Sequence, residues 1–276
     1  MSDDTMSDDT MSDDTGSDDP KIEEIQFDDL KPAAPPVKGE RIAKWLARAG
    51  VASRRDIEKL IEERVVRLNN AVVTQPATFV APGDLVQVRG KLVDPPAAAR
   101  LWRYHKPAGL VTTHRDPEGR ATVFEKLPPG MPRVVSVGRL DLTSEGLLLL
   151  TNDGGLARLL ELPAYGWVRR YRVRVFGRPD EDALKRLAQG VTVKGVRYGS
   201  IEAGLDSVKG DNCWLTVALK EGRNREIRKV MEYLGLRVSR LIRVAHGPFQ
   251  LGNLDRGEVS EVPRKVLREQ LPQAAL

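Results

Sequence analysis

The chain has 276 residues, of which 41% are hydrophobic and 30% are charged, so it holds enough apolar material for a soluble protein of about two domains. Its apolar runs stay far below the ~20 residues that span a bilayer, its acidic start does not resemble a secretory signal, and its single cysteine excludes an intramolecular disulfide. Three histidines and one cysteine also cannot build a Cys/His zinc cluster, so we expect a cytoplasmic protein with no metal and no membrane contact.

Charge is distributed unevenly along the chain. Residues 1–37 hold 12 acidic side chains and 2 lysines, a net charge of −10, whereas residues 38–276 hold 42 basic and 27 acidic side chains, a net charge of +15. A body this basic favours a polyanionic partner, because neutralised phosphates release their counterions. A merely solvated basic surface would have the same composition, so charge alone leaves both interpretations open.

The first residues repeat Met-Ser-Asp-Asp-Thr three times and continue as Gly-Ser-Asp-Asp-Pro. Such a polar, negatively charged stretch buries too little apolar surface to offset the entropy of ordering. We therefore predict a disordered acidic tail and linker over residues 1–38. The tail could compete with RNA for the basic body or could be a solubilising repeat, and its composition favours the second interpretation.

A small helical and stranded module is predicted over residues 39–93. A first helix covers residues 42–49 and ends at Gly50, a residue suited to the left-handed conformation that stops helices. Ser53 caps a second helix whose apolar residues recur at helical spacing. Two or three short strands follow within residues 65–89, joined by turns rich in Asn, Pro and Gly.

This module resembles the small RNA-binding domain first described in ribosomal protein S-four. The resemblance is carried by the stretch from Arg41 to Arg55, Arg-Ile-Ala-Lys-Trp-Leu-Ala-Arg-Ala-Gly-Val-Ala-Ser-Arg-Arg, and by the helix and hairpin after it. Leu68-Asn69-Asn70 stands where that family usually has Val-Asn-Gly, a mild departure because Asn tolerates positive φ. The resemblance implies RNA contacts by the basic side chains of the two helices, which are Arg41, Lys44, Arg48, Arg54 and Arg55.

A Pro- and Ala-rich linker is predicted over residues 94–99, a second domain over residues 100–271 and a short C-terminal tail over residues 272–276. We predict strands over residues 134–137, 147–151, 171–176, 191–196, 213–219 and 238–244, and helices over residues 156–162, 179–189 and 226–234. A hairpin-like turn, Lys209-Gly-Asp-Asn212, indicates antiparallel pairing. The fold class is therefore α+β, with a mixed, mainly antiparallel sheet in the second domain.

A polar loop, Gly138 to Gly146, lies between two of the apolar strands, so rigid elements should hold it. Asp141 is at its centre, close to Arg139. A carboxylate kept ionised by a neighbouring guanidinium can act as a nucleophile or an electrostatic stabiliser. Without further information, an aspartate in a loop more often forms a turn or a cap.

The sequence Gly138-Arg-Leu-Asp141, followed by a Leu-rich strand and Thr-Asn-Asp-Gly, resembles the signature of bacterial rRNA pseudouridine synthases, specifically the RsuA/RluB family. Further matching motifs occur in the family's order: His105-Lys-Pro-Ala-Gly109, Arg115-Asp-Pro-Glu-Gly-Arg120, Arg170-Tyr-Arg-Val-Arg-Val175, Glu221-Gly-Arg-Asn-Arg-Glu-Ile-Arg228 and Val238-Ser-Arg-Leu-Ile-Arg243. The resemblance covers residues 39–271.

The resemblance implies a role for each matched residue. Asp141 is the catalytic carboxylate, Tyr171 stacks on the base, and Arg228 pairs with the aspartate. Ile227 forms the apolar wall of the uracil pocket. Candidate contacts to the substrate's phosphates are Arg115, Arg120, Arg139 and Arg223.

The implied reaction detaches uracil from its ribose, turns it and rejoins it through carbon. This isomerisation is redox-neutral, so we expect no cofactor, and the chain has no dinucleotide or phosphate-loop fingerprint. The target nucleotide must leave its stack to reach the pocket. Whether Asp141 attacks the anomeric carbon or assists base departure stays open.

Two alternatives to this enzyme are compatible with parts of the sequence. Asp141 and Glu145 could form the carboxylate pair of a glycosidase, but a basic body argues against a neutral sugar polymer. A non-catalytic, RNA-binding ribosome-assembly factor on the same fold would be favoured by loss of Asp141 or Arg228, and both are present. The loops at 115–120 and 221–225 resemble the large-subunit branch of the family, so we expect large-subunit rRNA, or a pre-ribosomal particle, as the partner of a monomer. His105, His114, His246 and Cys213 are expected to be structural.

Overall fold

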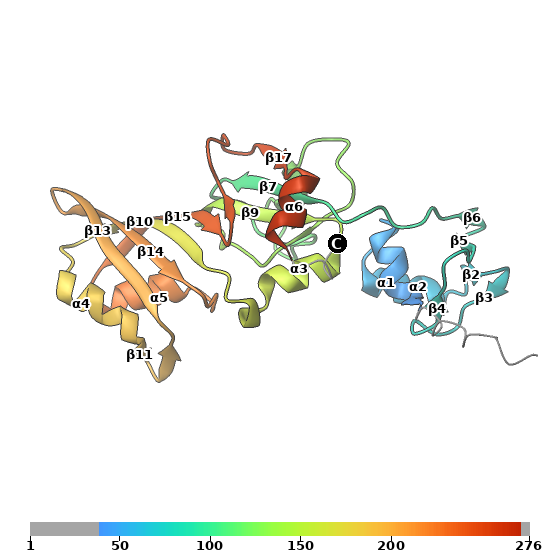
Figure 1. Ribbon diagram of the computed structural model, residues 1–276, viewed down its shortest axis with the longest axis horizontal. Coiled ribbons are helices and arrows are strands. Elements are labelled where there is room, and N and C mark those ends of the chain that lie inside the picture. Colours follow the sequence, from blue (N-terminus) through green and yellow to red (C-terminus); the bar gives the residue numbers. More distant parts are fainter. Residues whose placement is uncertain (1–38, 272–276) are drawn as a thin grey trace, which may run out of the picture. The chain divides into compact units, whose positions relative to one another are not determined.

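A computed structural model describes residues 39–271 of the chain (Figure 1). Residues 39–271 belong to one compact unit. The predicted acidic tail over residues 1–38 and the C-terminal tail over residues 272–276 both lie outside the described residues. Within residues 39–271, no helix combines the length and apolar character needed to cross a membrane.

This unit begins with two helices and a small antiparallel sheet. The helices are α1 (Ile42–Arg48) and α2 (Arg54–Glu62). The sheet has the order β3-β2-β5-β6, with β2 (Val66–Leu68), β3 (Ala71–Val72), β5 (Val86–Val88) and β6 (Lys91–Leu92), and β1 (Glu40–Arg41) pairs separately with β4 (Phe79–Val80). One core of buried aliphatic side chains joins the helices to the strands.

The helix end, the helix cap and the turn predicted for this region are confirmed. Gly50 has a φ of 83° after α1, and the Ser53 hydroxyl accepts the N–H of Asp56 at 3.2 Å to cap α2. Asn69 and Asn70 have φ values of 48° and 70°, which is the conformation of a two-residue hairpin turn between β2 and β3. Asparagine therefore replaces glycine in this turn without changing its geometry.

The rest of the unit is built on a nine-stranded sheet, whose main path is β13-β14-β10-β15-β9-β7-β17, with β16 added to β15 and β8 to β9. The strands are β7 (Leu101–Lys106), β8 (Val135–Ser136), β9 (Glu145–Thr151), β10 (Arg169–Phe176), β13 (Ile201–Lys209), β14 (Asn212–Leu219), β15 (Arg237–His246), β16 (Phe249–Gln250) and β17 (Val259–Glu261). Neighbouring strands are antiparallel except β15 and β9, which run parallel. The predicted mixed, mainly antiparallel α+β fold is confirmed.

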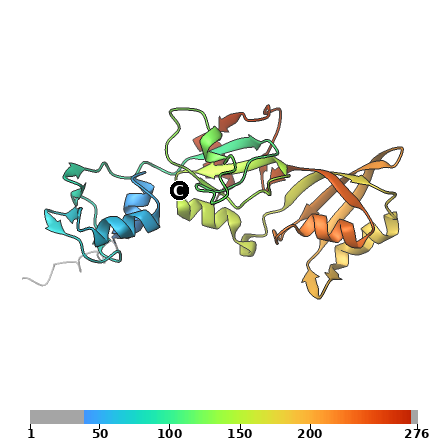
Figure 2. The ribbon, with the colours of Figure 1, turned by 180° about the vertical axis from the view of Figure 1, so that it is seen from behind.

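Helices α4 (Glu181–Arg186) and α5 (Glu226–Tyr233) lie on one face of β10 and β14, as Figures 1 and 2 show from opposite sides. The β10 residues on that face, Tyr171, Val173 and Val175, pack with Leu184 of α4 and Val230 of α5. The residues between them on β10 are exposed. This strand follows the two-residue alternation of a sheet with one covered face.

Strand β9 differs, because its run of leucines is buried on both sides. Leu147 and Leu149 pack in one core with α3 (Gly154–Glu161) and α6 (Arg264–Gln270). Leu148 and Leu150 pack in another core with residues of β7. Burial on both faces explains why this strand reads as a continuous apolar block.

Two predicted elements need correction. The single strand predicted over residues 191–196 is a hairpin of β11 (Val191–Val193) and β12 (Val196–Tyr198), because Lys194 and Gly195 have φ values of 48° and 79° and reverse the chain. The helix predicted over residues 179–189 ends at Arg186 and continues as a 3-10 turn, Leu187–Gln189. Strands β7, β13, β16 and β17 and helix α6 were not among the predicted elements, although the turn at residues 209–212 indicated an antiparallel partner for β14. In β13, exposed polar residues and Gly204 obscure the alternation.

Candidate active site

A cavity of about 890 Å³ opens between the loop that carries Asp141, the segment from Val111 to Arg120, and the start of α5. Strands β10 and β15 contribute its floor. Of the eight residues predicted to act on the substrate, seven line this cavity: Asp141, Tyr171, Ile227, Arg139, Arg115, Arg120 and Arg223. The fold thus gathers side chains that lie more than 100 positions apart in the sequence.

The backbone of the Asp141 loop is held from inside the protein by Lys106, the last residue of β7. This lysine is fully buried, and its Nζ donates hydrogen bonds to the carbonyl oxygens of Pro107, Asp141 and Ser144 at 3.0, 3.1 and 2.9 Å. Burial lowers the pKa of Lys106 to about 8, although the carboxylates of Asp141 and Glu145 oppose the shift. Lys106 belongs to the His-Lys-Pro-Ala-Gly motif, but sequence reasoning assigned it no role.

The loop is also fixed from the segment opposite. Thr112 donates its hydroxyl to the Leu140 carbonyl at 2.8 Å and accepts the Leu140 N–H at 3.3 Å. The Ser144 N–H closes a turn onto the Asp141 carbonyl at 3.0 Å. Asp141 is therefore presented on a backbone held on both sides, which is the preorganisation that catalysis by a carboxylate requires.

The cation nearest to the Asp141 carboxylate differs from the one expected. Arg225, the residue before α5, places Nη1 3.8 Å from Oδ2 of Asp141. Arg228 makes no ion pair with Asp141 within 4 Å in the described part of the chain, and instead donates to the carbonyl oxygens of Thr143 at 3.1 Å and Val238 at 3.3 Å. Arg228 therefore contacts the backbone of the loop in this structure, and its role as the partner of the carboxylate stays a prediction.

These two arginines can be separated by mutation. We expect Arg228→Ala to lower kcat about 30-fold, because removal of a charge-assisted hydrogen bond to Thr143 costs about 2 kcal/mol. We expect Arg225→Ala to lower it only a few-fold, because an exposed ion pair contributes at most about 1 kcal/mol. Single-turnover rates of the catalysed reaction measure both. A larger loss of kcat in Arg225→Ala than in Arg228→Ala would mean that the ion pair of Arg225 with Asp141 matters more to the reaction than the hydrogen bond of Arg228 to the loop.

The floor of the cavity carries buried polar side chains that the sequence analysis did not place there. Arg243 is 3% exposed and donates Nε to the Leu147 carbonyl at 2.7 Å, and Arg169 donates Nη1 to the Lys220 carbonyl at 2.8 Å. His246, predicted to be structural, lies beside them, and burial together with these arginines lowers its pKa to about 3, so the ring is neutral. The cavity lining therefore combines the cations of Arg169 and Arg243 with the buried carboxyl group of Glu226, whose pKa is raised by burial. The only indication of this floor in the sequence was that Arg243 ends one of the family motifs.

The arginines predicted to bind phosphates differ in whether their charge is already paired with a carboxylate of the protein. Arg115 and Arg139 are exposed and have no carboxylate within 4 Å among residues 39–271. Arg120 is bound by Asp116 through two hydrogen bonds of 2.8 and 3.0 Å, and Arg223 pairs with Glu221 at 3.0 Å. Arg115 and Arg139 are thus the better placed pair for binding an incoming phosphate.

Glu145 is not available as a second catalytic carboxylate. Its two oxygens accept hydrogen bonds from Arg240 at 2.6 and 3.0 Å, and Arg256 lies 3.3 Å away. The Arg240 hydrogen bond is the main reason that the pKa of Glu145 is lowered. Such a saturated carboxylate supports the strand and does not fit the glycosidase alternative.

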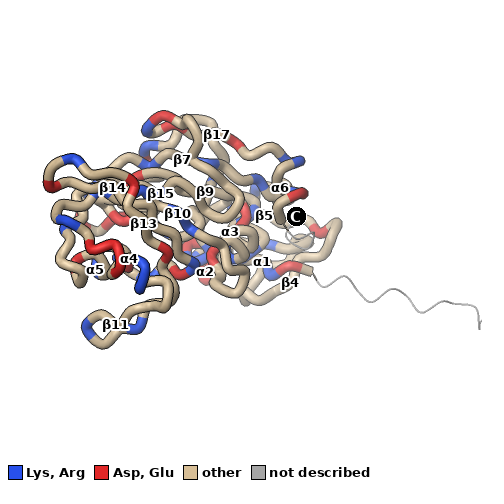
Figure 3. Tube along the Cα trace, turned by 60° about the vertical axis from the view of Figure 1, so that its left-hand side comes forward, with Lys and Arg blue, Asp and Glu red and all other residues tan. Residues whose placement is uncertain are grey.

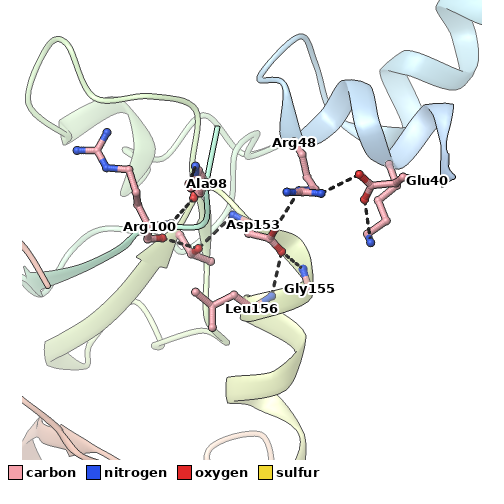
Figure 4. Close-up of polar contacts among 10 residues, drawn as sticks. Glu40, Arg48, Ala98, Arg100, Asp153, Gly155 and Leu156 are labelled. Carbon is pink, nitrogen blue, oxygen red and sulfur yellow. Dashed lines mark hydrogen bonds and ion pairs between the residues drawn. The ribbon is translucent and has the colours of Figure 1, made fainter. Parts of the chain in front are cut away.

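The basic residues of the first two helices also fall into two groups. Arg41, Arg54 and Arg55 are exposed without an ion pair among the described residues. Lys44 and Arg48 both pair with Glu40, at 2.8 and 2.7 Å, and Arg48 also pairs with Asp153 at 2.8 Å (Figure 4). The charge of Arg48 is therefore largely used inside the protein. Elsewhere lysine and arginine occur on both helices and strands (Figure 3).

Comparisons with known proteins agree with this geometry. Residues 100–233 match the family model described as RNA pseudouridylate synthase, and residues 40–86 match the S4 domain. An RNA pseudouridine synthase of Rickettsia prowazekii is 46% identical over 231 residues, which cover 84% of this chain and 97% of the relative. The ribosomal large subunit pseudouridine synthase B of Yersinia pestis is 41% identical, over 82% of this chain and 74% of that protein.

A solved structure has the same fold. The crystal structure of a pseudouridylate synthase superposes with a TM-score of 0.59 at 22% identity, over 84% of this chain and 99% of the other. At this identity the similarity bears on the fold alone.

Proposed function

Because the chain belongs to the RNA pseudouridylate synthase family, we propose that it isomerises one specific uridine of large-subunit rRNA to pseudouridine, with Asp141 as its catalytic carboxylate. The observation that carries the assignment of the site is the cavity in which Asp141, Tyr171 and Ile227 line one space. The choice of large-subunit rRNA rests on the relatives that carry that name.

The chemistry follows from the arrangement of this space. The target nucleotide leaves its stack and enters the cavity, where Tyr171 and Ile227 offer the base an aromatic and an apolar surface. Asp141 acts at the anomeric carbon while the bond from that carbon to the base nitrogen breaks. The base turns, and the anomeric carbon leaves Asp141 and bonds to a ring carbon of the base. The proton of that ring carbon leaves, and the nitrogen that was bonded to the ribose takes up a proton, so the product is an isomer of the substrate. Arg115 and Arg139, which are exposed and line the same cavity, would bind flanking phosphates.

The decisive experiment uses the full chain and two substrates. Protein-free transcripts of large-subunit and small-subunit rRNA are incubated with the protein, and pseudouridines are mapped on each. We expect one modified position, on the large-subunit transcript. The rRNA of cells that lack the gene should carry unmodified uridine at the same position. Modification of the small-subunit transcript would overturn the choice of substrate. RNA binding without any modification, including on pre-ribosomal particles, would favour the alternative of a non-catalytic assembly factor.

We propose in addition that the protein acts as a monomer in the cytoplasm. The RNA-binding module would cover residues 39–93, a linker residues 94–99 and the catalytic domain residues 100–271. The family matches over residues 40–86 and 100–233 support this division. An rRNA substrate supports the location.

The first module should contribute to affinity rather than to chemistry. We expect the combined change of Arg41, Arg54 and Arg55 to Gln to weaken rRNA binding and to reduce the slope of log K against log salt by about 2 to 3, since each lost phosphate contact removes close to one released counterion. Filter binding at several salt concentrations measures this. Arg48→Gln, whose charge is already paired, is the control and should change the slope little. An unchanged slope in the triple variant would remove these residues from the RNA interface.

A further inference from the structure

One face of the sheet has no role in the site described above. On β10 the side chains of Arg170, Arg172 and Arg174 alternate with buried residues and are all exposed. They are joined by Phe176 at the end of β10 and by Arg237 on β15, whose Cα positions pair in the sheet. We call these five residues, together with Trp214 of β14, which pairs with Arg174, the arginine face.

The arginine face lies on the opposite side of the sheet from the cavity. The cavity uses Arg169 and Tyr171 of β10, which are buried, whereas the arginine face uses the residues between them. Helices α4 and α5 cover the side of β10 that bears Tyr171, and the views in Figures 1 and 2 show no helix over the other side of β10 and β14. The arginine face is therefore open, and the proposed reaction leaves it unexplained.

The charge of this face is not balanced within the described residues. Arg170, Arg174 and Arg237 have no carboxylate within 4 Å among residues 39–271, and Arg172 reaches Asp206 only at 3.9 Å. Arginines two positions apart on a strand are about 7 Å from each other, so like charges repel along the face. A partner that brings regularly spaced negative charge would relieve this repulsion.

Aromatic rings are interleaved with these charges. The Arg172 guanidinium lies 4.9 Å from the centre of the Trp214 ring, and that of Arg237 lies 5.0 Å from the centre of the Phe176 ring. Phe176 is 43% exposed, although burial would be favourable for an apolar ring of this size. Planar guanidinium groups bind phosphates through paired hydrogen bonds, and both they and exposed aromatic rings stack on unpaired bases. This combination fits RNA better than it fits an acidic protein, which has no bases to stack.

We propose that the arginine face is a second RNA-binding surface, which binds the backbone of an rRNA segment other than the one that enters the cavity. The inference rests on the proposed function for the identity of the RNA. The catalytic domain would then contact its rRNA substrate on both sides of the sheet, at the cavity and at the arginine face. Recognition of the substrate then depends on the folded rRNA around the target uridine, since a short fragment that only fills the cavity cannot reach both surfaces.

The test removes three unpaired charges together in the full-length protein, as Arg170→Gln, Arg174→Gln and Arg237→Gln. The matched control removes three exposed charges from the side of α4 and the β11–β12 hairpin, as Lys185→Gln, Lys194→Gln and Arg197→Gln. The probe is a protein-free transcript of large-subunit rRNA, with affinity measured at 50, 100 and 200 mM salt. We expect the triple variant to bind about tenfold or more weakly and to lose about 2 to 3 from its salt slope, and the control to match the wild type.

Kinetics complete the test. The loss in the triple variant should be in KM for rRNA, with melting temperature unchanged, because all three substituted side chains are exposed. Wild-type affinity and slope in the triple variant would overturn the inference, and so would an equal loss in the control. If the real partner of the arginine face were an acidic protein, the triple variant would bind the transcript like the wild type, since the assay contains no second protein. Failure of the proposed function would instead appear as a wild-type protein that forms no pseudouridine on the transcript.

Discussion

Replacing Asp141 with asparagine should reduce pseudouridine formation at least about 1,000-fold while rRNA binding survives. The amide has nearly the same shape but cannot supply the negative charge or the electron pair that the anomeric carbon requires. The loop itself should persist, because its anchors at Thr112 and Lys106 act on backbone atoms and not on the carboxylate. Single-turnover formation of pseudouridine and filter binding, measured on the same transcript, separate the two effects.

A matched control is available in the same cavity. Asp116 also lines it, and its carboxylate is bound by Arg120 rather than presented to the substrate. Asp116→Asn removes an equal charge and should leave kcat within a few-fold of wild type. If Asp141→Asn retained a near wild-type rate, or if both substitutions were equally harmful, the assignment of Asp141 as the catalytic carboxylate would fail.

Replacing Lys106 with methionine should be the second most damaging change. Methionine fills similar volume, but it leaves the carbonyl oxygens of Asp141 and Ser144 without their buried donor. We expect kcat to fall about 100-fold and the free energy of unfolding to fall by about 3 kcal/mol, the range seen when one partner of a buried charged hydrogen bond is removed. Lys126→Met, on an exposed lysine, should change neither quantity. Wild-type kcat in Lys106→Met would exclude a positioning role for this lysine.

The pH dependence of the wild-type protein tests the same role without a substitution. The Lys106 pKa in the folded state is about 8, below its ordinary value of 10.5, so the folded protein loses this proton first. Between those two values the unfolded chain binds more protons, and the contribution of Lys106 to stability therefore rises with pH. Turnover should nevertheless fall above about pH 8, as the ammonium that holds the loop loses a donor and its charge. Rates and melting temperatures measured together across this interval test both statements: we expect the rate to fall while the contribution of Lys106 to stability rises.

Several features could be predicted because they depend on near neighbours in the chain. The end of α1 at Gly50, the cap at Ser53 and the hairpin at Asn69–Asn70 each follow from the conformational preference of one or two residues. The antiparallel pairing of β13 with β14 follows from the turn at residues 209–212. The location of Asp141 in a loop before a buried strand was readable from the change from polar to apolar residues.

Other features were determined only when distant segments packed together. Lys106 meets Ser144 across 38 positions, and Arg228 meets Thr143 across 85. Nothing in the local sequence of either residue indicates which carbonyl it will reach, and so the expected pairing of Arg228 with the carboxylate was not found. The buried polar floor of Arg169, Arg243 and His246 depends likewise on how β10 and β15 are paired and covered.

The sequence by itself therefore determined the fold class, the family and most residues around the cavity, because periodicity, turn chemistry and motif order are local properties. The tertiary structure alone decided which cations hold the Asp141 loop and which arginines stay free. On β10, Arg169 is buried in the cavity floor while Arg170, Arg172 and Arg174 are exposed on the other side. That division depends on which face α4 and α5 cover, and coverage is a property of packing between elements that no single strand encodes.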